Sequence, residues 1–246
     1  PPDPGGADTW ANAASGAADF NGDGYNDLAA ADKYYDTEDY DQVGRAWVLF
    51  GKSIEFSHSD ASMNSTATVI MTGTDDLHYF GAMIGAVPDV DGDGDDELLI
   101  MDPSVNDMYF ILGGTDLEIG EYGLADVDAV IEGVGSPPSA IVNVGDWTED
   151  GVDDVALAYG ASSISSSGGE VVILESKAWS GTHRLADIAA GSIEGTKYNG
   201  YFGSGIVKTP WDLDGDGKMD LVVGDHGYDE DEDGAEGAVF IFYSTL

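Results

Sequence analysis

The chain of 246 residues contains no cysteine, and only eight of its residues are lysine or arginine. The absence of cysteine excludes disulfide bonds and thiolate metal sites, although it leaves the cellular compartment open. The shortage of basic residues leaves a formal charge of −40 at pH 7, so the chain should repel nucleic acid and anionic membrane surfaces. No apolar run approaches the roughly 18–20 residues that a membrane-spanning helix needs.

Helical periodicity is also scarce, whereas glycine is abundant, with 35 residues. The one candidate helix, at 185–190, is interpreted as a loop or a single turn. A hydrophobic content of 42% permits a core over residues 10–246, while residues 1–9 have the composition of a linker. The sequence therefore predicts one large all-β domain after a short linker.

Acidic residues number 48, far more than the loops described below account for. Four bound divalent ions would add eight positive charges and leave the chain at −32, starting from −40. Salt screens repulsion between carboxylates, and carboxylates hold water. A high-salt (halophilic) habitat is therefore one hypothesis, and an acidic secreted protein is the other.

Four nine-residue loops repeat one pattern, with oxygen-bearing side chains at positions 1, 3, 5 and 9 and glycine at position 6. Hard oxygens that converge on one centre suit Ca²⁺, which takes about six to eight of them. The position-7 residue would contribute its carbonyl. The predicted ligands are Asp19, Asn21, Asp23, Tyr25 and Asp27; Asp89, Asp91, Asp93, Asp95 and Glu97; Asp146, Thr148, Asp150, Val152 and Asp154; and Asp212, Asp214, Asp216, Lys218 and Asp220.

The four loops are not equally charged. In the third loop Thr148 replaces an acid, so we expect three good calcium sites and a fourth that is weaker or empty. An EF-hand needs an acid at position 12, where these loops place only apolar residues, namely Ala30, Ile100, Leu157 and Val223. The plain alternative is a set of acidic turns without metal, because Asp and Gly populate turns in any case.

Short apolar runs follow each loop and predict strands that are buried on both faces. A more aromatic or branched run comes next, and a fainter fourth segment closes three of the units. The chain therefore divides into four repeats, at approximately 10–73, 74–133, 134–195 and 196–246. Each is predicted to be a four-stranded antiparallel blade, and several such blades in series favour a β-propeller.

An aromatic-glycine pair before the loop, as in Phe80-Gly81 and Phe202-Gly203, the acidic loop itself and the strand after it resemble the FG-GAP repeat. This is the repeat of the integrin alpha-subunit propeller and of many microbial surface proteins. The resemblance implies a calcium-bearing propeller, extracellular or on the cell surface, that serves in adhesion through a protein or glycan ligand or as a scaffold. The Gly-Ala-Pro part of the motif survives only loosely, as at Met101–Pro103.

Four repeats are fewer than this family's usual ring, and the last repeat shows no fourth strand. We expect a larger propeller of which this is a part, a ring completed by another chain or a missing segment, or an unusual four-bladed closure. We expect no enzymatic activity and no catalytic residues. The alternatives are a filament or surface-layer subunit joined by strand exchange, and a part of a calcium-dependent polysaccharide-active enzyme; the scarcity of basic residues disfavours the enzyme.

Overall fold

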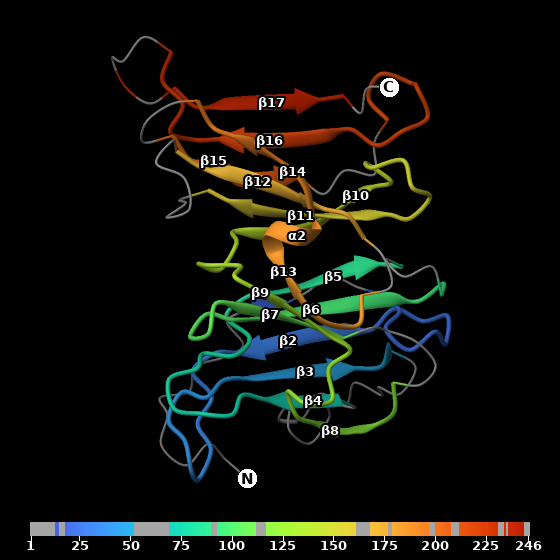
Figure 1. Ribbon diagram of the computed structural model, residues 1–246, viewed down its shortest axis with the longest axis vertical. Coiled ribbons are helices and arrows are strands. Elements are labelled where there is room, and N and C mark those ends of the chain that lie inside the picture. Colours follow the sequence, from blue (N-terminus) through green and yellow to red (C-terminus); the bar gives the residue numbers. More distant parts are fainter. Residues whose placement is uncertain are drawn as a thin grey trace, which may run out of the picture. The chain divides into compact units, whose positions relative to one another are not determined.

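The computed structural model describes residues 13–14, 18–51, 69–89, 93–111, 117–160, 168–176, 179–196, 200–207, 212–230, 234 and 236–243 (Figure 1). These residues form an all-β structure of four sheets, as expected. By its internal contacts the chain forms two compact units. The first contains Pro1–Val134 with Trp179–His183, and the second contains Gly135–Ala178 with Arg184–Leu246. The prediction of one domain over residues 10–246 stays a prediction, and the predicted linker lies outside the described residues.

The first unit holds two five-stranded sheets. The first sheet has the order β1-β2-β3-β4-β8, with β1 Ala13–Ala14, β2 Leu28–Asp32, β3 Arg45–Leu49, β4 Val69–Thr72 and β8 Gly120–Tyr122. The second has the order β13-β9-β7-β6-β5, with β5 Ile84–Pro88, β6 Asp96–Asp102, β7 Asp107–Ile111, β9 Ala129–Glu132 and β13 Gly181–Arg184. The apolar runs predicted as doubly buried strands are β2 and β6, both almost fully buried.

The second unit holds a four-stranded and a three-stranded sheet. The third sheet has the order β10-β11-β12-β14, with β10 Ala140–Gly145, β11 Asp154–Tyr159, β12 Glu170–Leu174 and β14 Ala189–Glu194. The fourth contains β15 Phe202–Val207, β16 Leu221–Asp225 and β17 Ala238–Phe242. The candidate helix is a single turn, α2 Leu185–Ile188.

The four antiparallel strands expected for each blade are present in the first three sheets, and the first two sheets have a fifth strand besides. The first sheet gains β8, which pairs with β4 in parallel, and the second gains β13 next to β9. Both extra strands come from the connection between the third and fourth strands of the following repeat, where no strand was predicted. The fourth sheet has three strands in the part of the chain that the structure describes, as its sequence suggested.

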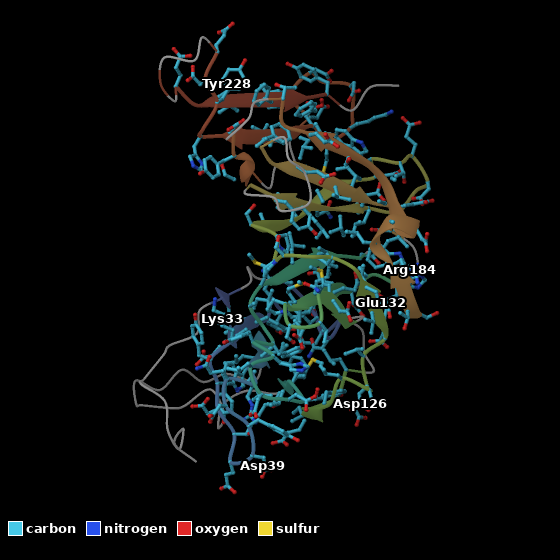
Figure 2. All side chains as sticks on the ribbon, turned by 60° about the vertical axis from the view of Figure 1, so that its left-hand side comes forward. Lys33, Asp39, Asp126, Glu132, Arg184 and Tyr228 are labelled. Atoms are coloured by element: carbon cyan, nitrogen blue, oxygen red, sulfur yellow. The ribbon has the colours of Figure 1, made fainter. Side chains whose placement is uncertain are left out.

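Each unit is held together by apolar side chains between its two sheets. Side chains of β2 and β3 pack against β6 in the first unit, and side chains of β11 and β12 pack against β16 in the second. The outer surface is acidic, and side chains such as Asp39 and Asp126 project from the loops into solvent (Figure 2). No helix in the described ranges is long and apolar enough to cross a membrane.

The aromatic-glycine pairs join neighbouring sheets through backbone contacts. Phe80 forms a parallel bridge with Gly44, which precedes β3, and Phe202 forms the same bridge with Gly169, which precedes β12. Both phenylalanines are almost fully buried. A Cβ atom on Gly44 would lie 2.2 Å from the Phe80 carbonyl oxygen, and one on Gly169 would lie 2.1 Å from that of Phe202. Glycine is therefore required at both positions for the turns to dock.

Candidate metal centre

The four acidic loops lie at equivalent places, each between the first and second strands of its sheet. In all four, the position-5 carboxylate accepts a hydrogen bond from the position-7 N–H at 2.9–3.0 Å. The position-1 carboxylate accepts from the position-6 N–H at 2.8–3.0 Å. The four loops therefore share the hydrogen bonds that join positions 1, 5, 6 and 7. The third has threonine at position 3, and Asp91 at position 3 of the second lies outside the described residues.

Glycine at position 6 has a physical reason in this conformation. Its φ lies between 84° and 100° in all four loops, in the left-handed region that side chains disfavour. The residue at position 4 also has a left-handed backbone conformation, with φ of 65° at Gly22 and 84° at Gly215. In the third loop Glu149 takes this conformation with φ of 61°. The third loop therefore carries conformational strain that its relatives in the chain avoid.

The fourth loop brings three carboxylates together. Asp212, Asp214 and Asp216 each offer a carboxylate oxygen, and these atoms lie within 4.8 Å of one another. Hydrogen bonds, first that from the Gly217 N–H, lower the pKa of Asp212. Desolvation, together with neighbouring carboxylates, raises the pKa of Asp214. All three side chains are exposed, so the cluster is open to an ion from solvent.

The position-9 acids are the buried members of the loops. Asp27, Glu97, Asp154 and Asp220 are all at most 3% exposed. Asp27 accepts hydrogen bonds from the N–H groups of Phe20 and Gly51, at 2.9 and 2.7 Å. Burial raises the pKa of Asp27, while these two N–H groups act in the opposite direction. The acid thus ties its loop to the chain segment that follows the third strand.

Asp154 has the same arrangement in the third loop. It accepts from the N–H groups of Thr148 and Ser176, at 2.7 and 2.9 Å, and burial raises the pKa of its carboxyl. Thr148 Oγ1 is buried and has no hydrogen-bond partner of sound geometry among the described residues, although the hydroxyl lies close enough to Asp154 to lower the pKa of that group. Such an oxygen fits a ligand position.

Neighbouring loops touch each other, which sequence reasoning did not anticipate. In the first unit, the Asp19 N–H donates to the Asp96 carboxylate at 2.7 Å, and the Asp96 N–H donates to the Asp19 carbonyl at 3.0 Å. The Asp95 carboxylate lies over Gly22, where a Cβ would be only 2.4 Å from it. Asp95 was predicted to offer its carbonyl, and that carbonyl accepts from the Asp89 N–H at 3.1 Å.

In the second unit the same two loop positions are joined by an ion pair. Lys218, at position 7 of the fourth loop, contacts the carboxylate of Glu149 at position 4 of the third. The hydrogen bond to Glu149 raises the pKa of Lys218. No pattern in the sequence predicts the contact between Lys218 and Glu149, because the two residues are 69 positions apart.

A second set of carboxylates, outside the nine-residue pattern, ends the strand that follows each of three loops. Asp32, Asp102 and Asp225 are buried, and each accepts from the N–H two residues later at 2.9–3.1 Å. They hold the turn after the strand. Their recurrence at one offset from the loops is the sequence signal that could have identified them.

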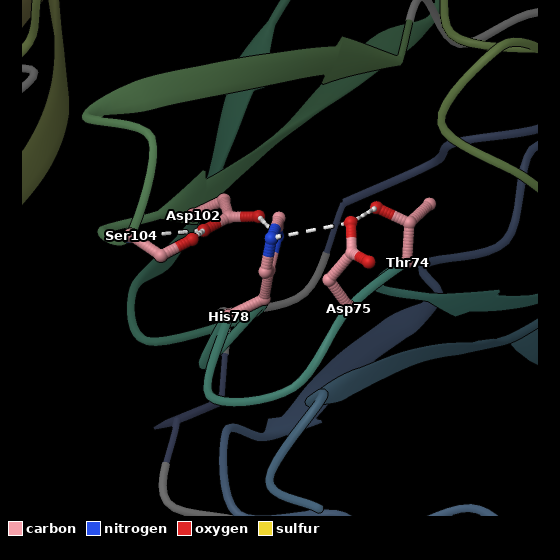
Figure 3. Close-up of polar contacts among 5 residues, drawn as sticks. All are labelled: Thr74, Asp75, His78, Asp102 and Ser104. Carbon is pink, nitrogen blue, oxygen red and sulfur yellow. Dashed lines mark hydrogen bonds and ion pairs between the residues drawn. The ribbon is translucent and has the colours of Figure 1, made fainter. Parts of the chain in front are cut away.

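Asp102 also holds a histidine (Figure 3). Its carboxylate lies 2.7 Å from His78 Nδ1 and accepts from Ser104 Oγ at 2.6 Å, while His78 Nε2 lies 3.7 Å from Asp75. The serine hydroxyl thus contacts the carboxylate and not the imidazole. A serine nucleophile would need its hydroxyl in contact with the imidazole that acts as its base. These residues therefore have the geometry of a structural cluster.

A comparison with protein families finds a match near the beginning of the chain. The model of the FG-GAP repeat matches residues 11–49, which include the first loop with strands β2 and β3 on its C-terminal side. No curated protein was found to match the chain. The match over residues 11–49 agrees with the predicted resemblance to the FG-GAP repeat.

Proposed function

We propose that this chain is a calcium-binding propeller module that acts outside the cell. The observation that carries the proposal is the convergence of Asp212, Asp214 and Asp216 in a loop whose hydrogen bonds recur in the other three. The donor set consists of carboxylate, amide, hydroxyl and carbonyl oxygens, which suits a hard cation and not a soft one. FG-GAP repeats often bind calcium, which supports the same conclusion.

The residues that would hold the ion are those at positions 1, 3, 5 and 9 with the position-7 carbonyl. Bound Ca²⁺ would supply positive charge among carboxylates that otherwise repel one another. The chain's own contribution is rigidity: N–H groups at positions 5 to 7 hold the position-1 and position-5 carboxylates in place. The third loop is proposed to bind weakest, because Thr148 offers a hydroxyl at position 3, where the second and fourth loops have a carboxylate and the first has the amide oxygen of Asn21.

The role of the module is proposed to be adhesion, through a protein or glycan ligand, or support of neighbouring domains, without catalysis. FG-GAP repeats are typical of extracellular proteins, and this supports a location outside the cell or on its surface. The sheets are proposed to be blades of a propeller. The face-to-face packing of two sheets within each unit supports this arrangement.

The test is the dependence of unfolding on calcium. At a calcium concentration ten times Kd, each site adds about 1.4 kcal/mol to the free energy of unfolding, so three sites add about 4 kcal/mol. Calorimetric scans in calcium and in chelator should therefore differ by many degrees, and calcium titration should report three strong sites. Mg²⁺ is the control, because it accepts such flexible all-protein oxygen sites reluctantly. Equal melting in calcium and in chelator at constant ionic strength would overturn the proposal.

A further inference from the structure

Within each unit, the side chain at position 7 of one acidic loop reaches position 4 of the loop before it. In the first unit, the Asp95 carboxylate lies against Gly22 and leaves no room there for a Cβ atom. In the second unit, the Lys218 ammonium contacts the carboxylate of Glu149. Two pairs of loops therefore meet through the same two positions, although the position-7 side chains differ in the sign of their charge.

Position 7 is charged only in the two loops that make this contact. The second loop has Asp95 and the fourth has Lys218, whereas the first and third loops have Tyr25 and Val152. The position-7 residue is proposed to offer the ion its carbonyl oxygen, which belongs to the backbone. The identity of the position-7 side chain is therefore not set by the ligand geometry of its own loop.

Asp95 brings a negative charge to the first loop. The backbone holds the two loops together at this point, because the Asp96 N–H donates to the Asp19 carbonyl at 3.0 Å. Desolvation raises the pKa of Asp95, and the neighbouring carboxylates, first Asp93 and then Asp19, raise it further. Asp19 is the position-1 ligand predicted for the first loop. The Asp95 charge therefore acts on the ligands of the first loop as well as on those of its own loop.

Lys218 brings a positive charge to the third loop. The hydrogen bond to Glu149 raises the pKa of Lys218, and the charges of Glu149, Asp216 and Asp146 act in the same direction. Asp146 is the position-1 ligand predicted for the third loop. It lines a hollow of about 460 Å³ together with Glu149 and Lys218. The Lys218 ammonium is therefore close enough to the ligands of the third loop to repel a cation that binds there.

We infer, resting on the proposed calcium function, that the position-7 side chain sets the calcium affinity of the loop before it: Asp95 strengthens binding in the first loop, and Lys218 weakens it in the third. Between a unit charge and a divalent ion about 7 Å apart in water, with screening by about 0.1 M salt, Coulomb's law gives about a threefold change in Kd. In the third loop, Lys218 adds to the effect of the uncharged Thr148. In the first loop, Asp95 offsets the missing charge of Asn21.

The test is a calcium titration, followed by NMR at low ionic strength, that reports each loop separately. Each loop has a position-6 glycine whose N–H donates to the position-1 carboxylate of the same loop, namely Gly24, Gly94, Gly151 and Gly217. Asp95→Asn should raise the Kd read at Gly24 about threefold, and Lys218→Gln should lower the Kd read at Gly151 about threefold. Both changes should shrink in about 1 M salt, where the Debye length falls to about 3 Å.

Matched variants separate this effect from the overall charge of the chain. Asp39→Asn and Asp229→Asn each remove one charge from the connection at the far end of the strand that follows the first or the fourth loop, β2 or β16. Both should leave the Kd values at Gly24 and Gly151 unchanged. Lys218→Arg keeps the positive charge at position 7, so it should also leave the Kd at Gly151 unchanged.

The outcomes distinguish this inference from the proposed function. A calcium response at Gly151 that is present only in Lys218→Gln would support the inference. Calcium binding in the intact protein with no change of Kd at Gly24 in Asp95→Asn and at Gly151 in Lys218→Gln would overturn the inference alone. So would changes confined to each variant's own loop, read at Gly94 and Gly217. The absence of any saturable calcium response at the four glycines, in the intact protein and in both variants, would overturn the proposed function and the inference together.

Discussion

Replacement of a single glycine tests whether the aromatic-glycine turns hold the sheets together. The variants are Gly169→Ala, in which the new methyl group meets the backbone of the docked Phe202, and Gly237→Ala, at the equivalent position without a docked turn. Both glycines have positive φ, of 113° and 72°. The pair therefore shares the conformational penalty, and only one member has the steric conflict.

The expected magnitudes differ clearly. Alanine in the left-handed region costs about 1–2 kcal/mol, and this is the whole loss expected for Gly237→Ala. In Gly169→Ala the methyl carbon would also lie 2.1 Å from the Phe202 carbonyl oxygen. Backbone atoms cannot yield that far, so the turn must undock and expose Phe202, a loss on the scale of about 3 kcal/mol for a buried phenylalanine. The total expected for Gly169→Ala is about 4 kcal/mol or more.

The assay is urea unfolding in the presence of calcium, at a protein concentration low enough to keep the chain monomeric. Gly44→Ala serves as a replicate in the first unit, because its φ of 80° closely matches that of Gly237 and its methyl would lie 2.2 Å from the Phe80 oxygen. If Gly169→Ala and Gly44→Ala lose no more stability than Gly237→Ala, docking of the turns contributes nothing to cohesion between sheets, and the reasoning fails.

Three further outcomes follow from the loops and from one strand. Asp216→Asn should remove more of the calcium-dependent rise in melting temperature than Asp150→Asn, because the third loop is the weaker site; equal losses would contradict that order. Lys218→Gln should change stability only slightly and only at low salt, because Lys218 and Glu149 are 30% and 57% exposed; a double-mutant cycle with Glu149→Gln measures the pair. Burial, with two neighbouring carboxylates, raises the pKa of Asp107 above 3.8. The protonated Asp107 therefore adds to the free energy of unfolding below pH 3.8, and this contribution is lost as pH rises through the raised pKa. Asp107→Asn should therefore stabilise the protein by ~0.5 kcal/mol at neutral pH and by less in acid, and urea unfolding at both pH values checks the sign.

Local patterns in the sequence predicted the main strands well. The apolar runs after the loops became β2, β6, β11 and β16, because four or five apolar residues between glycine and aspartate have few ways to be buried except as a central strand. The aromatic-rich runs became the neighbouring strands for the same reason. The fainter fourth segments also formed strands, at β4, β9 and β14.

The extra strands β8 and β13 could not be predicted in this way. β8 reads Gly-Glu-Tyr and β13 reads Gly-Thr-His-Arg, so neither has an apolar alternation that marks a strand. They are strands only because a free sheet edge lies beside them, and that edge belongs to the preceding repeat. Contacts between loops, such as Lys218 with Glu149, escape prediction for the same reason: they depend on how two repeats meet.

The position-9 acid explains why a cation would stabilise these repeats more than a simple acidic turn. Asp27 is buried without a cationic partner among the residues that the structure describes, and burial raises its pKa. Each of its oxygens accepts one N–H, and an ionised carboxylate retains further lone pairs for a metal. With only eight basic residues in the chain, a divalent ion is the available counter-charge for a carboxylate in this position. The carboxylate would then serve the fold and the metal together: it anchors the loop to the end of the third strand, and a bound ion offsets the cost of burying its charge.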